Sequence, residues 1–481
     1  MFSFHSIKDY QSLLLNGKAT CADAVSYYIK NIEQNRHLNA FLEVYKEEAL
    51  ERAAQLDAKR KAGDALGKLH GVIIGLKDVV SYRNHKLSAG SRILENFQAV
   101  YNATAVNRLL EEDAVIIGRQ NCDEFAMGSS NENSAYGNVL NAADNARVPG
   151  GSSGGSAVGV QAKLCMISLG SDTGGSVRQP ADFCGVVGLK PSYGRVSRYG
   201  LIAYASSFDQ IGIFANSVED AGIVLEVISG KDEFDSTATG NAFQFHYSPV
   251  KSGFKIGYFP VTFNHPGLDP EIAATQKKFI ASLREEGLEV SQIEFDLLDY
   301  IVPAYYILTT AEASSNLARY DGLKYGAQQP ATDLNEQIHL TRSRFFGKEV
   351  QRRIMLGTFV LSEGYYEAYI MQAQKVRRIL LEKIKKIFTE VDAIILPVSP
   401  TTAFRIGEKS NDPIAMFLAD IYTVFANLTG IPAISIPLFK HSNGMPFGLQ
   451  VMASHSNELA LLSIAEYLME INKTANQPVS V

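Results

Sequence analysis

Two glycine-serine clusters that lie close together in the chain constrain its fold more than any other feature. Residues 150–157 read GGSSGGSA, and residues 170–176 read GSDTGGS. Between them lie small residues, followed by an apolar run at residues 165–169. This pattern predicts a loop, a helix, a buried strand and a second loop. Both clusters are therefore expected at the same edge of a sheet.

Clusters of this kind suit a reaction centre better than a linker or a phosphate-binding loop. Glycine lets the backbone approach a ligand closely, and successive glycines direct several N–H groups at one point, as in an oxyanion hole. A linker is polar on both sides, whereas apolar segments flank both clusters. A Walker-type phosphate loop needs a lysine before its final Ser or Thr, and neither cluster has one. Serines in such loops act as nucleophiles when a base lies nearby.

The base for such a serine is predicted to be a lysine. None of the nine histidines stands in a Ser-His-Asp context. Lys77, in contrast, interrupts the apolar run of residues 72–80. Burial disfavours the ammonium form, and bringing its pKa near 7 needs on the order of 4–5 kcal/mol of destabilisation. The alternative interpretation is a structural ion pair between Lys77 and Asp78.

The composition fits a globular enzyme of the cytoplasm. Its 481 residues suffice for one large domain or for two to three ordinary ones. The net charge of −6 argues against a broad basic surface for nucleic acid. Four scattered cysteines without a Cys-x-x-Cys motif indicate reduced thiols. The sequence has neither a secretion-like start nor a run approaching 18 apolar residues.

Strands alternate with helices from residue 69 onward, after a helical stretch that ends near residue 61. One βαβ-like unit joins strands at residues 255–259 and 288–295. A helix with an apolar stripe at residues 376–387 precedes a strand at residues 393–396. We therefore expect an α/β fold with a mixed, largely parallel central sheet, helices on both of its faces, and additional N-terminal helices. Residues 230–252 are the best candidate for a domain boundary.

Three motifs together resemble the amidase signature family. They are GVIIGLKDVV at residues 71–80, GGSSGGS at residues 150–156 and DTGGSVRQPA at residues 172–181. The resemblance implies a Ser-Ser-Lys triad. Ser176 is then the acylated nucleophile, Ser152 is a bridging serine held in a cis peptide, and Lys77 is the base.

The same resemblance implies an oxyanion hole and a domain division. The hole is expected from the backbone N–H groups of Thr173, Gly174, Gly175 and Ser176. The resemblance runs from about residue 69 to about residue 450. It therefore favours an N-terminal helical segment at residues 1–65, packed on one amidase domain at residues 66–481.

The segment DEFAMGSS at residues 123–130 is predicted to be a turn that leads into the site. Its two adjacent carboxylates would face opposite ways on a strand, so they do not form an acid-base pair. The resemblance implies that Gly128 and Ser129 contact the substrate.

The second half of the chain resembles the A subunits of the bacterial aminoacyl-tRNA amidotransferases, a group within this family. The resemblance rests on YY at residues 305–306, EASSNLARYDG at 312–322, GKEVQRRIMLG at 347–357, and residues 412–420. An arginine fork suits the α-carboxylate of glutamine, and a carboxylate suits its α-ammonium. By motif position we expect Arg353 in the first role, Asp420 in the second and Tyr306 as a pocket wall. The sequence does not separate Tyr305 from Tyr306.

The resemblance implies a glutaminase that supplies ammonia to a partner subunit, for ATP-dependent conversion of Glu-tRNA(Gln) to Gln-tRNA(Gln). The expected partners are the B and C subunits, with tRNA bound mainly through the partner. ATP and Mg are expected in the partner subunit, and neither a cofactor nor a metal in this chain. The sequence does not distinguish Glu-tRNA(Gln) from Asp-tRNA(Asn) as the substrate served. Two alternatives stay open: a free-standing amidase for another small amide, and a non-catalytic scaffold subunit.

Overall fold

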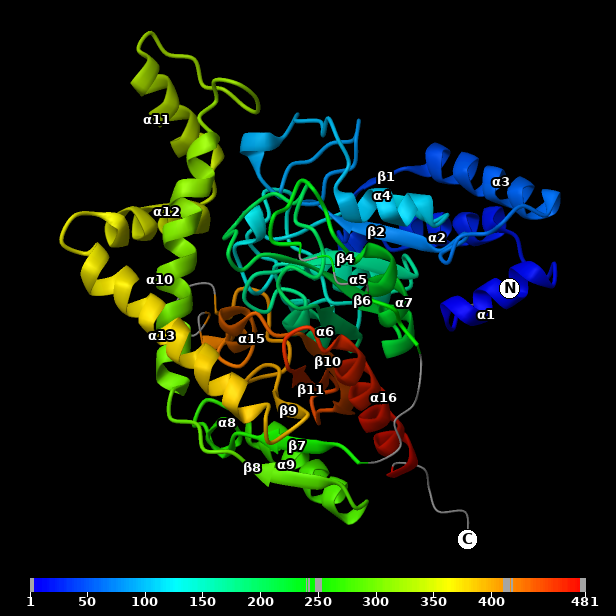
Figure 1. Ribbon diagram of the computed structural model, residues 1–481. Helices are drawn as coiled ribbons and strands as arrows, with labels where there is room; N and C mark the ends of the chain where they lie inside the picture. The colour runs from blue at the N-terminus through cyan, green and yellow to red at the C-terminus, as the bar shows by residue number, and fades with distance from the viewer. Residues whose placement is uncertain are drawn as a thin grey trace.

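A computed structural model of the chain describes residues 4–238, 240, 243–246, 253–409, 416 and 418–475. Within these residues eleven strands form one sheet in the order β1-β3-β2-β4-β6-β5-β10-β11-β9-β7-β8 (Figure 1). The strands are β1 (Phe41–Val44), β2 (Ile73–Lys77), β3 (Val115–Gln120), β4 (Ile167–Asp172), β5 (Val187–Lys190), β6 (Gln210–Ala215), β7 (Lys255–Tyr258), β8 (Glu289–Gln292), β9 (Ala393–Pro397), β10 (Ala433–Lys440) and β11 (Pro446–Ala453).

The sheet is mixed, as expected, but parallel pairs do not dominate it. Strand β2 pairs in parallel with β3 and β4, and β7 pairs in parallel with β8 and β9. The other six pairings are antiparallel. The expectation that the central sheet is largely parallel is therefore wrong. One reason is the short return between β10 and β11, since so short a connection joins only antiparallel strands.

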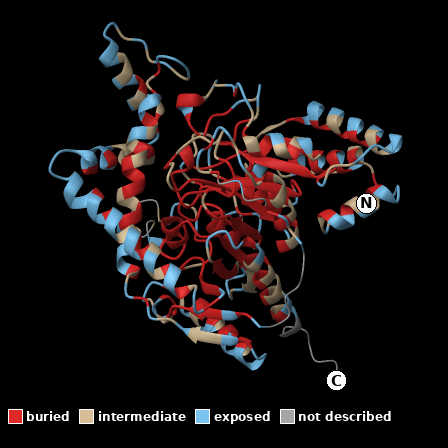
Figure 2. Cartoon of the chain, viewed as in Figure 1, coloured by how far each residue is buried: buried red, intermediate tan, exposed pale blue. Residues whose placement is uncertain are grey.

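Helices cover the sheet on both faces. Strands β2, β3, β4 and β6 are buried along their whole length, which requires cover on each face. Helices α5 and α6 pack together over central strands, while α7 packs against α4 and α16. Helices α10, α12 and α13 form an outer layer along one side (Figure 1). Figure 2 shows buried residues concentrated in the sheet and exposed residues on these outer helices.

The α-helices are α1 (Ile7–Leu15), α2 (Cys21–Gln34), α3 (Lys46–Ala62), α4 (Thr104–Glu111), α5 (Gly154–Gln161), α6 (Arg178–Cys184), α7 (Val218–Ile228), α8 (Pro260–Phe263), α9 (Pro270–Glu285), α10 (Leu298–Asn316), α11 (Leu334–Phe345), α12 (Lys348–Leu361), α13 (Tyr366–Ile387), α15 (Val424–Thr429) and α16 (Glu458–Ala475). Short 3₁₀ turns lie at Arg36–Leu38, Arg92–Leu94, Glu124–Ala126 and Leu317–Arg319. Among the described residues, no helix is long and apolar enough to cross a membrane.

The N-terminal segment contains the expected helices and one strand that the sequence did not reveal. Thr20 caps α2, because its side chain accepts a hydrogen bond from the backbone N–H of Asp23. Strand β1 follows α2 and pairs with β3, so the segment contributes an edge strand to the central sheet. The division at residue 65 stays a prediction. The candidate domain boundary at residues 230–252 is described only in part. The residues of this segment that lie outside the described part are 239, 241–242 and 247–252.

Two local predictions are confirmed. Helix α5 and strand β4 separate the two glycine-serine clusters, which gives the expected order of loop, helix, strand and loop. Strands β7 and β8 are parallel neighbours joined through α9, as expected of a βαβ-like unit.

Candidate active site

The sheet topology brings both glycine-serine clusters to one edge. Strands β2 and β4 are parallel, so Lys77 at the end of β2 and Asp172 at the end of β4 lie at the same edge. Strand β6 runs antiparallel to β4 and begins there, where Gln210 pairs with Asp172. The first cluster leads into α5 and the second follows β4.

The amine of Lys77 is fully buried and lies among three serine hydroxyls. The distances from its Nζ are 2.7 Å to Oγ of Ser152, 2.8 Å to Oγ of Ser153 and 2.9 Å to Oγ of Ser171. The sequence had assigned only Ser152 to this contact. Burial lowers the pKa of Lys77 to about 8, because an apolar interior disfavours the ammonium form. Roughly one lysine in ten is then neutral at pH 7.

Hydrogen bonding distinguishes the hydroxyl of Ser153 from the other two. The hydroxyl of Ser153 donates to the carbonyl oxygen of Ser171 at 3.1 Å, so towards Lys77 its oxygen only accepts. The backbone N–H of Ser153 donates to the carbonyl oxygen of Ser176 at 3.3 Å. This bond brings the Ser152–Ser153 backbone beside Ser176. The peptide bond between Gly151 and Ser152 is cis, as the resemblance implied.

The hydroxyl of Ser176 remains open to a substrate. The residue is 9% exposed, and its Oγ makes no hydrogen bond with any residue described here. The alternative role for Lys77, an ion pair with Asp78, is wrong. Asp78 instead accepts a hydrogen bond from Nη1 of Arg119 at 2.7 Å and from the backbone N–H of Ser88 at 2.9 Å.

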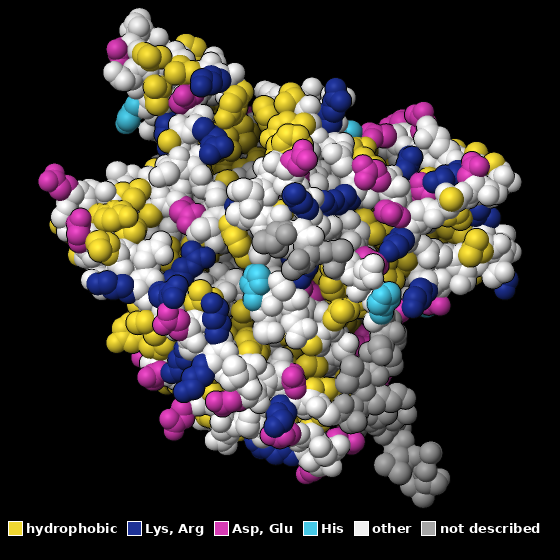
Figure 3. Space-filling model, in the orientation of Figure 1, with side chains coloured by type: hydrophobic (Ala, Val, Ile, Leu, Met, Phe, Trp, Pro, Cys, Tyr) yellow, Lys and Arg dark blue, Asp and Glu magenta, His cyan; other side chains and the backbone are white. Residues whose placement is uncertain are grey.

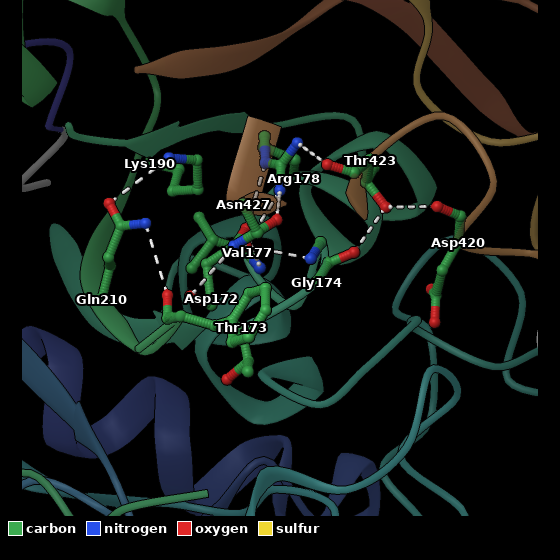
Figure 4. Close-up of polar contacts among 12 residues, drawn as sticks. Asp172, Thr173, Gly174, Val177, Arg178, Lys190, Gln210, Asp420, Thr423 and Asn427 are labelled. Atoms are coloured by element: carbon green, nitrogen blue, oxygen red, sulfur yellow. Dashed lines mark hydrogen bonds and ion pairs between the residues drawn. The ribbon is translucent and has the colours of Figure 1, made fainter. Parts of the chain in front are cut away.

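A buried ion pair holds the second glycine-serine loop (Figure 4). Arg178 donates from Nε and Nη2 to the two carboxylate oxygens of Asp172 at 3.1 and 2.9 Å. The Asn427 side chain donates to Asp172 at 2.9 Å and accepts from Arg178 at 2.6 Å. Arg178 also donates to the carbonyl oxygen of Thr423 at 2.7 Å and to the side chain of Gln450. The Arg178 guanidinium keeps the pKa of Asp172 well below its usual range, although burial alone would raise it.

The carboxylate of Asp172 changes the predicted oxyanion hole. It accepts the backbone N–H of Gly175 at 2.9 Å, so that N–H does not point at a substrate. The N–H groups of Thr173, Gly174 and Ser176 make no hydrogen bond within the described residues, so these three stay candidates for the predicted hole. Gly175 has a φ of +131°, and a Cβ there would lie 2.2 Å from Oγ1 of Thr423. Only glycine fits this position.

Three predicted substrate contacts meet at the carboxylate of Asp420. Its Oδ2 accepts hydrogen bonds from Oγ of Ser129 at 2.9 Å and from the hydroxyl of Tyr306 at 3.2 Å. Its Oδ1 makes no hydrogen bond with the described residues. Burial raises the pKa of Asp420 to about 7. A buried carboxylate with one open oxygen is suited to pair with an ammonium.

Arg353 lies over the ring of Tyr306. It is buried, and its Cζ lies 5.4 Å from the centroid of the Tyr306 ring. Its Nε donates to Oε1 of Glu349 at 2.8 Å and its Nη1 to the hydroxyl of Tyr204 at 2.7 Å. Within the described residues its Nη2 makes no hydrogen bond. Ser129, Tyr306, Arg353 and Asp420 are thus brought together, with one cation and one anion around an aromatic wall.

Thr423 and Tyr305 connect this polar end to the oxyanion loop. The hydroxyl of Thr423 donates to the carbonyl oxygens of Gly174 at 2.6 Å and Asp420 at 3.1 Å. Figure 4 shows the carboxylate of Asp420 pointing away from that contact. A Cβ on Gly174 would lie 2.3 Å from the hydroxyl of Tyr305. The structure therefore distinguishes the two tyrosines. Tyr305 packs on the loop of Gly174, whereas Tyr306 contacts both Arg353 and Asp420.

The turn at residues 123–130 is confirmed, with its two carboxylates held apart. Burial raises the pKa of Asp123 to about 6. A Cβ on Gly128 or on Gly151 would lie within 2.4 Å of its carboxyl group, so Asp123 fills the space between these two glycines. Glu124 instead accepts the backbone N–H of Gly347 at 2.8 Å, at the start of α12. Gly128 thus packs on Asp123, and its contact with substrate stays a prediction.

Sequence reasoning missed several residues that complete this site. Ser153 and Ser171 bind the amine of Lys77, Tyr204 and Glu349 hold Arg353, and Asn427 supports Asp172. The expected run at residues 412–420 lies partly outside the description, which omits residues 412–415 and 417.

Activity is expected to rise with pH through two steps. Asp420, with a pKa of about 7, pairs with a substrate ammonium only when it is ionised. Lys77, with a pKa of about 8, accepts a proton only when it is neutral. Both changes favour activity as the pH increases. Plotting kcat/KM against pH from about 6 to 9 should show the rise, and Asp420→Asn should remove only the lower step. A decrease between about pH 7 and 8 would contradict these roles.

The sequence model of the Amidase family matches residues 23–462. The chain therefore belongs to the amidase family. Its sequence is 49% identical over 467 residues to the A subunit of glutamyl-tRNA(Gln) amidotransferase of Chlorobium phaeobacteroides. The aligned region covers 96% of this chain and 98% of the relative. The corresponding subunit of Koribacter versatilis is 51% identical over 449 residues, covering 92% of this chain and 93% of the relative.

Solved structures show the same fold. The crystal structure of the A subunit of glutamyl-tRNA(Gln) amidotransferase from Thermotoga maritima superposes with a TM-score of 0.78 at 37% identity, covering 96% of this chain and 94% of that chain. The peptide amidase of Stenotrophomonas maltophilia superposes with a TM-score of 0.81 at 27% identity. The superposition covers 98% of this chain and 97% of the amidase chain. The fold is therefore shared by proteins whose names describe different amide substrates.

Proposed function

We propose that this chain is the glutamine-hydrolysing A subunit of a glutamyl-tRNA(Gln) amidotransferase, acting in the cytoplasm. The observation that carries the proposal is that an Asp420 carboxylate with one open oxygen and the Arg353 guanidinium both contact Tyr306, close to the loop of Ser176. Glutamine presents an ammonium and a carboxylate at a fixed distance from its side-chain amide. A site with both charges next to a nucleophile matches that chemistry. The relatives that carry this subunit's name support the same conclusion.

The proposed reaction proceeds through an acyl-enzyme. Neutral Lys77 accepts a proton from Ser152, which accepts the proton of Ser176 as its oxygen attacks the side-chain amide carbon. The N–H groups of Thr173, Gly174 and Ser176 stabilise the oxyanion. The C–N bond then breaks, and the same relay protonates the nitrogen, which leaves as ammonia. Water attacks the acyl carbon, releases glutamate and restores Ser176.

The proposal includes partner chains, because ammonia released to solvent becomes ammonium and loses its nucleophilicity. We propose B and C subunits as partners, ATP and Mg in the partner that uses the ammonia, and tRNA contact mainly through the partner. A surface suited to such an assembly lies on α12 and α13, where apolar side chains are exposed (Figure 3). These are Met355, Phe359, Tyr365, Tyr366 and Tyr369. Exposed apolar patches of this kind mark protein interfaces.

The decisive experiment compares substrates on the purified chain. Glutamine should be hydrolysed to glutamate and ammonia in equal amounts, with kcat/KM far above that for butanamide, which lacks both α-substituents. Asp420→Asn and Arg353→Lys should each lower kcat/KM for glutamine by about 10- to 100-fold, the effect of a lost charged hydrogen bond. They should leave butanamide turnover nearly unchanged.

Arg378→Lys provides the matched control. Arg378 is an exposed arginine on α13 that pairs with Glu382 and makes no contact with the site residues named above. Its glutamine kinetics should equal those of the unmodified chain. Equal turnover of glutamine and butanamide would favour the free-standing amidase. Glutamine binding without turnover would favour the scaffold.

A further inference from the structure

Arg353 presents only one end of its guanidinium to a ligand. Its Nε is engaged by Glu349 at 2.8 Å, and its Nη1 by the hydroxyl of Tyr204 at 2.7 Å. The ring of Tyr204 also lies beneath the guanidinium, with its centroid 5.5 Å from Cζ. A guanidinium held at two of its three nitrogens cannot turn to follow a misplaced ligand. A carboxylate must therefore approach Nη2 and the remaining N–H of Nη1.

Tyr204 is itself fixed by the residues that support the oxyanion loop. Its backbone N–H and that of Ala205 donate to Oδ2 of Asp209 at 2.9 and 3.0 Å. The other oxygen of Asp209 accepts the hydroxyl of Thr173 at 2.7 Å. All of these residues are buried. A continuous series of hydrogen bonds thus runs from Arg353 through Tyr204 and Asp209 to Thr173.

We infer that Tyr204 is a positioning residue that makes the site specific for amides carrying an α-carboxylate. The inference rests on the proposed glutamine hydrolysis. The phenol oxygen accepts one N–H of Arg353 and so directs the free N–H groups towards the substrate. Because Tyr204 is held by the same carboxylate as Thr173, the carboxylate-binding end and the oxyanion loop keep a fixed separation. A substrate with the right spacing between carboxylate and amide is selected.

The test is Tyr204→Phe, which removes the hydroxyl and keeps the ring. With glutamine we expect KM to increase about 10-fold or more and kcat to stay close to its original value, since a bond to a charged group that orients the ligand is lost. With 4-aminobutanamide, which keeps the ammonium but lacks the α-carboxylate, kcat/KM should not change. A purely structural role for Tyr204 would lower the activity towards both substrates alike.

Tyr193→Phe is the matched control. The hydroxyl of Tyr193 donates to the carbonyl oxygen of Ser206 at 3.0 Å, in the same loop as Tyr204. This variant loosens that loop without removing a hydrogen bond of Arg353, so its KM for glutamine should not change. An equal increase in KM for Tyr193→Phe would overturn the inference, as would an unchanged KM for Tyr204→Phe while the unmodified chain turns over glutamine. If the unmodified chain neither hydrolyses nor binds glutamine in calorimetry, the proposed function fails and this inference fails with it.

Discussion

Replacing Ser176 by alanine is expected to abolish glutamine hydrolysis, with kcat reduced by at least about 10⁴-fold. The reason is that the substitution removes the attacking oxygen, while the serine hydroxyls of Ser152, Ser153 and Ser171 are hydrogen-bonded to the amine of Lys77. The melting temperature should not change, because Oγ of Ser176 makes no hydrogen bond within the described part of the chain. The measurement is glutamate and ammonia release, together with a thermal melt of each variant.

Ser156→Ala is the control for this substitution. Ser156 is a buried serine of the first cluster whose hydroxyl donates to the carbonyl oxygen of Leu169 at 3.2 Å, and not to the amine of Lys77. It should keep its turnover. Co-expressed with its partner chains, Ser176→Ala should still elute with them and should form amidated tRNA from added ammonium chloride but not from glutamine. Glutamine turnover that survives in Ser176→Ala would refute the nucleophile.

Lys77→Met is expected to lower kcat by about 10³-fold or more without destabilising the fold. The chemistry loses its proton acceptor, which typically contributes 10²–10⁴-fold. The free energy of unfolding is affected in a different way from kcat, because the pKa of Lys77 is lowered from 10.5 to about 8 in the folded chain. The folded state therefore binds its proton less well than the unfolded chain, and stability is lost as the pH falls from about 10.5 to about 8. At pH 7 that loss is roughly 3 kcal/mol. Methionine removes this loss but also removes the hydrogen bonds of the amine to Ser152, Ser153 and Ser171, so the two effects oppose each other.

Lys190→Met shows whether the loss of activity is specific to Lys77. Lys190 is also fully buried, but its amine contacts the carbonyl oxygens of Pro191 at 2.9 Å and Ile431 at 2.6 Å instead of serine hydroxyls. Its kcat should stay within about 10-fold of the unmodified chain. Thermal melts and ammonia release at about pH 7 and 9 measure both effects. Comparable losses of kcat in the two variants would argue against Lys77 as the base.

The sequence was sufficient to predict that Lys77 lies beside Ser152 and that the two glycine-serine loops meet, because the three motifs together resemble one family. Lys77 and Ser152 are in contact, and the loops of Ser152 and Ser176 lie side by side, as expected. The contacts of Ser153 and Ser171 with the amine were not predictable. They depend on how α5 and β4 pack, because Ser153 lies directly before α5 and Ser171 lies inside β4.

The missed contacts at the substrate end join residues far apart in the chain. Tyr204 and Arg353 are 149 positions apart, and no local pattern marks their contact. Strand β1 was missed because it has four half-buried residues and no clear alternation. The antiparallel middle of the sheet was missed because β5 and β10 become neighbours only through the tertiary fold. Periodicity reports local structure and burial, whereas register and long-range pairing depend on the whole chain.

The strand order also has a consequence for synthesis on the ribosome. Strands β10 and β11, from residues 433–453, lie in the middle of the sheet, and Gln450 completes the contacts of Arg178. Lys77, Ser152 and Ser176 leave the exit tunnel long before these segments are translated. A nascent chain therefore carries every reactive group while the strands that anchor its second loop do not yet exist. We therefore expect glutaminase activity only when nearly all of its length has emerged, and we expect interrupted translation to leave inactive fragments.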